Sequence, residues 1–359
     1  MIRANVIAQL RHKASAMAYG TALYQWTLGG NIPEKLSVIP PDPWPGDAGN
    51  GRFLCQDVFC LNGERLPACD GNFESAGATP VWVAHIHGFE WLRDLRALGG
   101  DQGRRQARAM VTAWMDRYGG WNETAWRPDL TGRRIAMWIA LHDFFAASAD
   151  DVFQTNYLAS LLRQARHLSR ALPGPLAGLK LLQALKGLVY AGLAFEGREQ
   201  WLEQGLTLLD HETKKQILND GGHISRSPSQ LLDAMRVYID LRAALQAGQY
   251  PVPDFVQHAI DRMAQALRFL RYSDRHLALF NGAQEGDDAL IEMVQMVGNA
   301  HGRILKSLPD TGYERVTIGR SLLMVDTGRA PVWPHDEQAH AAPLAFEFCY
   351  GKERVLVSC

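Results

Sequence analysis

The side chains with the clearest capacity for chemistry follow a pair of glycines in the middle of the chain. The segment runs Asn219-Asp220-Gly221-Gly222-His223-Ile224-Ser225-Arg226-Ser227-Pro228. Adjacent glycines predict a turn, because glycine adopts positive φ without steric cost. A serine followed by a proline predicts a helix start, since serine suits the N-cap and proline suits the first helical position. We therefore expect a loop between two helices that presents His223, Ser225 and Arg226.

Each of these polar side chains has a chemical and a structural interpretation. His223 suits a general base or a partner for a carboxylate, because imidazole normally titrates near neutral pH. Arg226 offers a planar pair of donors that fits a carboxylate. Alternatively, His223 caps a neighbouring helix, Arg226 forms a surface ion pair, and the serines only satisfy helix ends.

Other titratable groups favour structural roles. Tyr157, Tyr190, Tyr238 and Tyr272 are candidate acids or bases, but each occupies a helical position suited to core packing. The run His85-Ile86-His87 is a poor metal site on a helix, because residues i and i+2 do not share a face. The five cysteines match neither a zinc spacing nor a disulfide framework and are expected to be free thiols.

The bulk composition is that of a globular protein with a sizeable core. The chain has 359 residues, of which 47% are hydrophobic and 21% charged. A formal net charge of -1 excludes a global basic field for nucleic acid or anionic membranes. No apolar run reaches the roughly 20 residues of a membrane span. The first 28 residues lack a continuous apolar stretch, so we expect no secretory signal and a cytoplasmic location, with the periplasm as the alternative.

Hydrophobic periodicity predicts a mainly α chain that ends in β structure, with a helical domain at 1–275 and an antiparallel β domain at 276–359. Helices are expected at 85–98, 107–118, 133–145, 151–172, 176–195, 199–217, 230–245 and 255–270, and strands at 313–318, 321–326, 344–350 and 354–358. Short strands are also expected at 53–62 and 80–83. Helices of similar length with short connections favour antiparallel hairpins, which suit a stacked or toroidal array.

Several motifs, in their order along the chain, resemble the heparinase II/III-like family of polysaccharide lyases. After the glycine segment come Leu279-Phe280-Asn281-Gly282, Gly312-Tyr313-Glu314-Arg315, Ala339-His340-Ala341 and Leu344-Ala345-Phe346-Glu347-Phe348; earlier runs are Phe89-Glu90-Trp91-Leu92-Arg93-Asp94-Leu95 and Arg163-Gln164-Ala165-Arg166-His167-Leu168. The resemblance covers the chain from about His85 onward. It implies an incomplete α/α toroid followed by part of an antiparallel β-sandwich, which in that family continues beyond the point where this chain stops.

The resemblance also implies a reaction, β-elimination on uronic-acid glycans. This chemistry needs a group that neutralises the uronate carboxylate, a base for the adjacent proton and an acid for the leaving oxygen. By resemblance, His223 and His340 are the expected catalytic residues, and Arg226, Ser225 and Gln230 the expected substrate-binding residues. For His340 the structural alternative is a polar residue at the entry to a strand.

This chain departs from the family pattern at three places. Ser225 and Gln230 stand near the positions where active members have a glutamate and a tyrosine. The run Pro175-Leu176-Ala177-Gly178 lacks the usual asparagine. The His-x-His-x-Asp pattern appears as Gln338-Ala339-His340-Ala341-Ala342, with only its second histidine. No metal or other cofactor is therefore predicted, although a zinc ion stays an open alternative.

Three hypotheses for function follow. The first is a lyase that cleaves an acidic oligo- or polysaccharide, heparin-like or other, by β-elimination. The second is a degenerate member that binds an anionic glycan without cleaving it, as the missing tyrosine and asparagine suggest. The third is a glycoside hydrolase on a similar toroid, but no pair among Asp143, Glu196, Glu203 and Asp233 is selected by its spacing.

Overall fold

A computed structural model of the chain describes residues 17–67, 73, 79–299, 303–337, 339 and 344–358. It divides into two compact units, which we describe separately. Unit 1 comprises Met1–Leu176 with Gln183–Leu206, and unit 2 comprises Ala177–Leu182 with Thr207–Cys359. These units group residues differently from the division by secondary structure at residue 275, which stays a prediction. Two helices, α10 (Gly178–Ala194) and α11 (Glu199–Gln216), contribute residues to both units.

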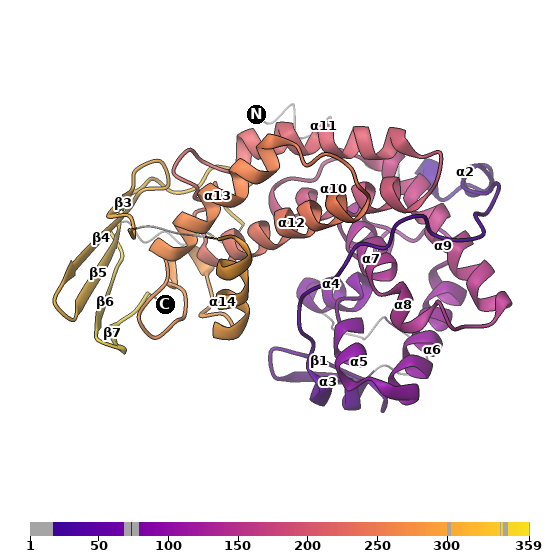
Figure 1. Ribbon diagram of the computed structural model, residues 1–359, viewed down its shortest axis with the longest axis horizontal. Coiled ribbons are helices and arrows are strands. Elements are labelled where there is room, and N and C mark those ends of the chain that lie inside the picture. Colours follow the sequence, from indigo (N-terminus) through magenta and orange to yellow (C-terminus); the bar gives the residue numbers. More distant parts are fainter. Residues whose placement is uncertain are drawn as a thin grey trace. The chain divides into compact units, whose positions relative to one another are not determined.

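Unit 1 is built mainly of helices (Figure 1). They are α2 (Ala22–Thr27), α3 (Ala48–Leu54), α4 (Pro80–Gly88), α5 (Leu92–Leu98), α6 (Gly100–Tyr118), α7 (Pro128–Ala140), α8 (His142–Phe145) and α9 (Asp151–Ala171). Strands β1 (Val58–Leu61) and β2 (Glu64–Pro67) form an antiparallel hairpin. The prediction of a strand at 80–83 is wrong, because Thr79 caps α4 by accepting a hydrogen bond from the Trp82 amide (3.4 Å) and Pro80 opens the helix. The strand predicted at 53–62 exists only over β1.

The core of unit 1 contains most of its tryptophans. Phe89 contacts Trp91 and Trp138, with ring centroids 4.8 and 5.2 Å apart. The guanidinium of Arg134 is fully buried, 3.9 Å from the ring centroid of Trp114. It donates to the carbonyl of His87 (2.9 Å) and so has polar partners despite its burial. These aromatic residues therefore stabilise the helical core, the role that the sequence favours for most tryptophans.

Unit 2 combines helices with a five-stranded sheet. Its complete helices are α12 (Pro228–Ala247), α13 (Asp254–Phe269), the short 3-10 helix η1 (Phe280–Gly282) and α14 (Asp288–Val297). The strands are β3 (Ser307–Leu308), β4 (Tyr313–Ile318), β5 (Ser321–Asp326), β6 (Phe346–Tyr350) and β7 (Glu353–Leu356). They pair in sequence order, antiparallel throughout. The predicted change from helix to antiparallel sheet is confirmed.

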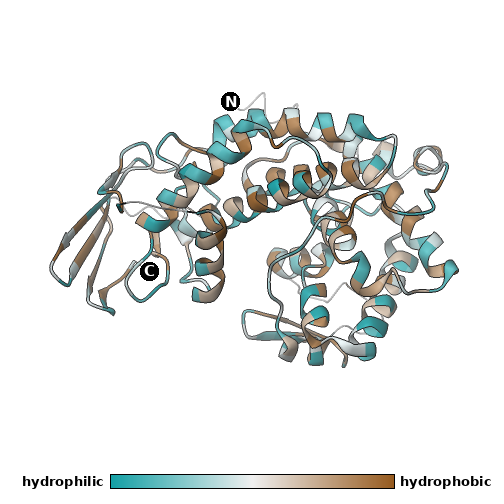
Figure 2. Ribbon diagram, in the orientation of Figure 1, coloured by the Kyte–Doolittle hydropathy of each residue, from teal (hydrophilic) through white to brown (hydrophobic). Residues whose placement is uncertain are grey.

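The two faces of this sheet differ in burial. One face contains the buried side chains Leu322, Met324 and Cys349. The opposite face leaves large apolar side chains exposed, namely Val316, Ile318, Phe346, Tyr350 and Leu356. The middle of β5 is correspondingly brown in Figure 2, since both faces of this strand are apolar.

Within the described ranges, no helix combines the length and the apolar character that crossing a bilayer requires.

Candidate functional site

The glycine segment forms a tight loop, residues 217–227, between α11 and α12 in unit 2, and we call it the glycine loop. Ile217 and His223 form an antiparallel bridge, and the Leu218 amide donates to the carbonyl of Gly222 (2.9 Å). Gly221 adopts φ +88°, and a Cβ there would lie 2.1 Å from the carbonyl oxygen of Arg262. The predicted turn is confirmed, and its glycine is required both by conformation and by space.

Helix α12 begins at Pro228 with Ser227 at its N-cap, as the sequence predicts, although the Ser227 side chain makes no capping hydrogen bond. The loop is instead attached through Asp220. Its carboxylate accepts hydrogen bonds from the amide and the hydroxyl of Thr311, both at 2.7 Å, and from the Gly222 amide at 3.0 Å. Thr311 lies two residues before β4, so Asp220 joins the loop to the start of the sheet.

His223 is buried and neutral inside the glycine loop. Its Nδ1 lies 3.2 Å from the Ser225 amide nitrogen, which can only donate, so Nδ1 is the acceptor. The proton therefore resides on Nε2, which donates to Oε1 of Gln216 (3.3 Å), while the Ser225 hydroxyl donates to Nδ1 (2.7 Å). Burial, followed by the nearby charge of His335, lowers the pKa of His223 to about 3. At neutral pH this imidazole contributes no positive charge.

Arg226 adopts the left-handed conformation, with φ +59°, and its guanidinium is also buried. Its Nε donates to the carbonyl of Thr311 (2.6 Å), and its Nη1 donates to that of Arg329 (2.8 Å). Its Nη2 donates to the carbonyl of Gly312 (3.3 Å) and forms an ion pair with Asp326. The carboxylate that Arg226 binds in this structure is therefore one of the protein's own.

Two further side chains complete what we call the Arg226 network, which consists of Arg226, Asn281, Thr311, Tyr313 and Asp326. The guanidinium lies 5.0 Å from the ring centroid of Tyr313, whose hydroxyl donates to the Arg226 carbonyl (2.6 Å). Asn281 donates to the Tyr313 hydroxyl (2.7 Å) and to Asp326 (3.4 Å). The network thus joins the glycine loop to two other motifs of the resemblance, those containing Asn281 and Tyr313.

The structure brings His223 and Ser225 into direct contact, with Arg226 next to them. Gln230 lies in the first turn of α12 and is partly exposed. His340 lies outside the described residues, as do Gln338 and the three residues after His340. The chemical roles predicted for the site residues stay predictions; these residues are His223, Ser225, Arg226, Gln230 and His340.

The candidate tyrosines occupy different environments. Tyr157 and Tyr238 are fully buried in helices, where their hydroxyls bond to the Trp138 carbonyl (2.8 Å) and to the Thr213 hydroxyl (2.6 Å). Tyr190 is also buried. Their burial suits the packing role that their helical positions predict.

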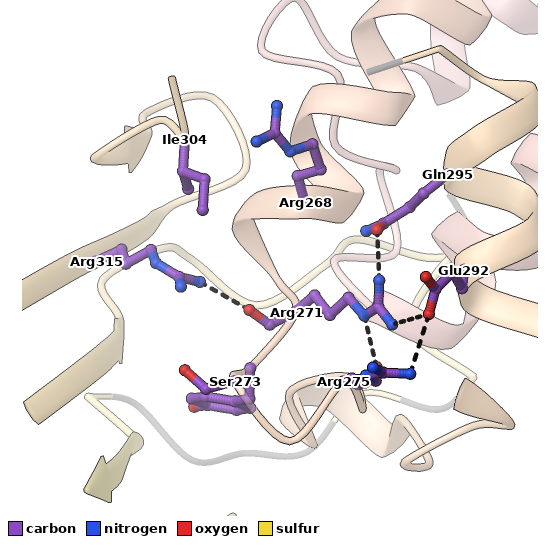
Figure 3. A pocket seen from close by; sticks show the side chains of 9 residues that line it. Arg268, Arg271, Ser273, Arg275, Glu292, Gln295, Ile304 and Arg315 are labelled. Atoms are coloured by element: carbon purple, nitrogen blue, oxygen red, sulfur yellow. Dashed lines mark hydrogen bonds and ion pairs between the residues drawn. The ribbon is translucent and has the colours of Figure 1, made fainter. Parts of the chain in front are cut away.

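Unit 2 also contains a cationic pocket of about 320 Å³ beside the C-terminal end of α13. We call it the arginine pocket, and its lining is Arg268, Arg271, Tyr272, Ser273, Arg275, Glu292, Gln295, Ile304 and Arg315 (Figure 3). The sequence gives no local signal for this pocket, because Arg271 and Arg275 lie beyond the end of α13 at Phe269 and Arg315 lies on β4.

No group of three or more His, Cys, Asp or Glu side chains with the geometry to hold a metal ion occurs in the part of the chain that the structure describes. The predicted absence of a cofactor stays a prediction, because His340 is not among the described residues.

Comparison with known proteins identifies the family. Residues 108–301 match the model for the heparinase II/III N-terminus, and residues 300–359 match that for the heparinase II/III-like C-terminal region. The chain belongs to the heparinase II/III family. The resemblance inferred from the motifs is thereby confirmed.

Individual relatives agree with this assignment. FtsZ-localized protein C of Caulobacter vibrioides (strain NA1000 / CB15N) is 32% identical over 343 residues, which cover 95% of this chain and 59% of that protein. The crystal structure of heparinase III superposes with a TM-score of 0.69 at 16% identity, covering 97% of this chain and 63% of that chain. Heparan sulfate lyase HepC from Pedobacter heparinus gives a TM-score of 0.58 at 17% identity, covering 95% and 60%.

These likenesses confirm the predicted fold class, helical hairpins of a toroid followed by an antiparallel sheet. At such low identity, the two enzyme structures establish the fold alone. The chain spans about three fifths of the length of these relatives.

Proposed function

We propose that this protein acts on uronic-acid-containing glycans as a polysaccharide lyase that works by β-elimination. The observation that supports this most is the match to both family regions, which together extend from residue 108 to residue 359. The glycine loop adds a neutral imidazole, His223, in the motif where the family resemblance places a catalytic group.

The reaction defines what each side chain would do. A base removes the proton next to the uronate carboxylate, the electron pair forms a carbon–carbon double bond, and the glycosidic oxygen leaves with a proton from an acid. His223 can accept a proton but cannot neutralise the carboxylate, since it is uncharged at neutral pH. It would act as the base only after its contacts with Ser225 and Gln216 opened, because both ring nitrogens are occupied and the residue is 1% exposed.

The second candidate is a member that binds an anionic glycan without cleaving it. This alternative is favoured by the burial of the proposed bases, since His223, Tyr157 and Tyr238 expose no more than 1% of their surface. The name of the Caulobacter relative states a location with FtsZ. A fluorescent fusion of this chain, imaged together with labelled FtsZ, would test whether that location is shared.

The cellular compartment of the protein would restrict which glycans it can meet. A cytoplasmic location would suit short imported oligosaccharides or a cell-envelope precursor better than long extracellular chains. Recovery of the protein in a periplasmic extract would contradict that location.

The deciding experiment follows the ultraviolet absorbance of the unsaturated uronate product over a panel of acidic glycans. We would compare the wild type, His223→Ala and the control His211→Ala, because the His211 side chain is 65% exposed in the same unit. Product formed by the wild type and by the control, but not by His223→Ala, supports a lyase that uses His223. Product formed by all three supports a lyase with a different base.

Calorimetry with the same glycans separates the remaining outcomes. Saturable binding without product would refute the lyase and support the binding protein. Absence of both product and binding across the panel would refute both candidates.

A further inference from the structure

We infer that the arginine pocket is a binding site for the sulfate or phosphate monoester group of a small ligand. This site is separate from the glycine loop, and the inference does not rest on the proposed lyase activity.

The pocket concentrates positive charge in a chain whose formal net charge is -1. Four guanidinium groups and a single carboxylate, that of Glu292, line it. Glu292 is about half exposed and approaches Arg271 and Arg275 only at 3.5 and 3.4 Å, so solvent weakens both ion pairs. The neighbouring carboxylate of Asp274 is bound to Arg354 at 2.6 Å and does not line the pocket.

Arg271 holds a buried donor that lacks a hydrogen bond. Its Nε donates to the carbonyl of Arg275 (2.7 Å) and its Nη1 donates to Oε1 of Gln295 (2.7 Å). These bonds fix the guanidinium, as the dashed lines of Figure 3 show. Its Nη2 makes no hydrogen bond and has only the 3.5 Å ion pair with Glu292, and the Nε2 of Gln295 is buried without a hydrogen-bond partner. Buried donors rarely stay without a hydrogen bond, so these two on one pocket lining favour an acceptor-rich ligand.

Structural roles account for some of the four arginines of the arginine pocket, but not for all of them. Arg315 donates to the carbonyls of Phe269 and Arg271, and thereby satisfies carbonyls at the C-terminal end of α13. Arg268 lies in the last turn of α13, where the helix dipole favours a cation. That dipole is equivalent to roughly half a negative charge. It is therefore outweighed by the excess of three positive charges in the lining.

The geometry selects a tetrahedral oxyanion. Donors reach the pocket from α13, from the turn after it, from α14 and from β4. A monoester presents three terminal oxygens and can accept from several directions, whereas a carboxylate presents two in one plane. The volume of 320 Å³ is at the lower end of the roughly 300–1,000 Å³ of small-molecule sites, which suits a single charged sugar.

The test is isothermal calorimetry on the full chain at low ionic strength. The probes are inorganic sulfate, inorganic phosphate, N-acetylglucosamine 6-sulfate and glucose 6-phosphate, with N-acetylglucosamine as the uncharged control. Binding of either ester, but not of the uncharged sugar, supports the site, and the better-bound ester identifies the source of the oxyanion. Failure of both esters and both inorganic anions to bind at millimolar concentration would overturn it.

Variants distinguish the pocket from general electrostatics. Arg268→Gln with Arg275→Gln removes two rim charges and should weaken ester binding about tenfold or more. The control Arg320→Gln with Lys352→Gln removes the same charge from exposed positions of the sheet hairpins and should leave affinity unchanged. Equal weakening by both pairs would overturn the assignment.

Glu292→Gln provides a test that does not depend on the double variant folding. Removing the only carboxylate of the pocket lining should tighten ester binding about threefold. This is the effect expected of one charge several ångströms away in a solvent-exposed environment of high dielectric constant. This gain should vanish at high salt. Weaker or unchanged binding at low salt would contradict the inference.

Discussion

The Arg226 network predicts that Arg226→Met destabilises unit 2. Methionine keeps much of the apolar stem but removes the donors to three backbone carbonyls and leaves Asp326 buried without its cation. Breaking a buried ion pair from one side costs about 3–5 kcal/mol. Asp326 still accepts hydrogen bonds from the Gly328 amide (3.0 Å) and from Asn281 (3.4 Å). We therefore expect a loss near the lower limit, about 3 kcal/mol.

The assay is urea unfolding followed by circular dichroism, together with amide hydrogen exchange in the glycine loop. Exchange is included because a chain of two compact units need not unfold in one step. Adding Asp326→Asn to Arg226→Met removes the uncompensated charge and should recover part of the lost stability, a coupling that independent sites would not show.

The same variant tests the alternative role of Arg226. If this guanidinium is reserved for a substrate carboxylate, Arg226→Met should weaken glycan binding while stability and loop exchange stay close to those of the wild type. A stability change within about 0.5 kcal/mol, the usual effect of a surface substitution, would refute the structural reasoning.

Two further predictions concern the glycine loop. Because the pKa of His223 is about 3 in the folded protein and about 6.5 when unfolded, the unfolded state binds more protons between these values. The unfolding free energy should therefore fall as pH is lowered from about 6.5, by at most about 1.4 kcal/mol per unit for this residue. Urea titrations at pH 7 and 5 should show a smaller drop for His223→Gln, and an equal drop in both proteins would contradict the pKa. Gly222→Ala should lower the thermal midpoint, because its Cβ would lie 1.8 Å from the Thr311 hydroxyl, whereas the control Gly120→Ala meets Gln25 only at 3.9 Å. Equal midpoints for these two variants would show that the loop is not closely packed against Thr311.

The fold could be predicted where local sequence determines local structure. Apolar periodicity located most of the longer helices of both units, and alternation located β6, because these patterns repeat within a few residues. The prediction of a strand at 80–83 was wrong for a related reason. Val81, Trp82 and Val83 favour a strand intrinsically, but the cap at Thr79 and the proline after it start a helix. In that short segment the helix-start signals outweigh strand propensity.

The site could be predicted only in part, because its partners are distant in sequence. The turn at Gly221 could be predicted from the adjacent glycines Gly221 and Gly222. The partner of Arg226 could not be predicted, since Asp326 lies 100 positions further along the chain and no local pattern connects them. The arginine pocket combines Arg268 and Arg315 from separate elements in the same way.

The position of the motifs explains why family membership was easier to infer than activity. Asp220 and Arg226 in the glycine loop, Asn281 in η1, and Tyr313 at the start of β4 meet in one largely buried set of hydrogen bonds. Motifs that meet there identify a chain that folds in the family's way, whether or not it retains the family's reaction. The resemblance places some of the residues that would decide the reaction at positions where this sequence departs from the family pattern, such as Ser225 and Gln230. The activity of this chain therefore has to be assigned from product formation and from the variants of His223, since the fold can account for the motifs themselves.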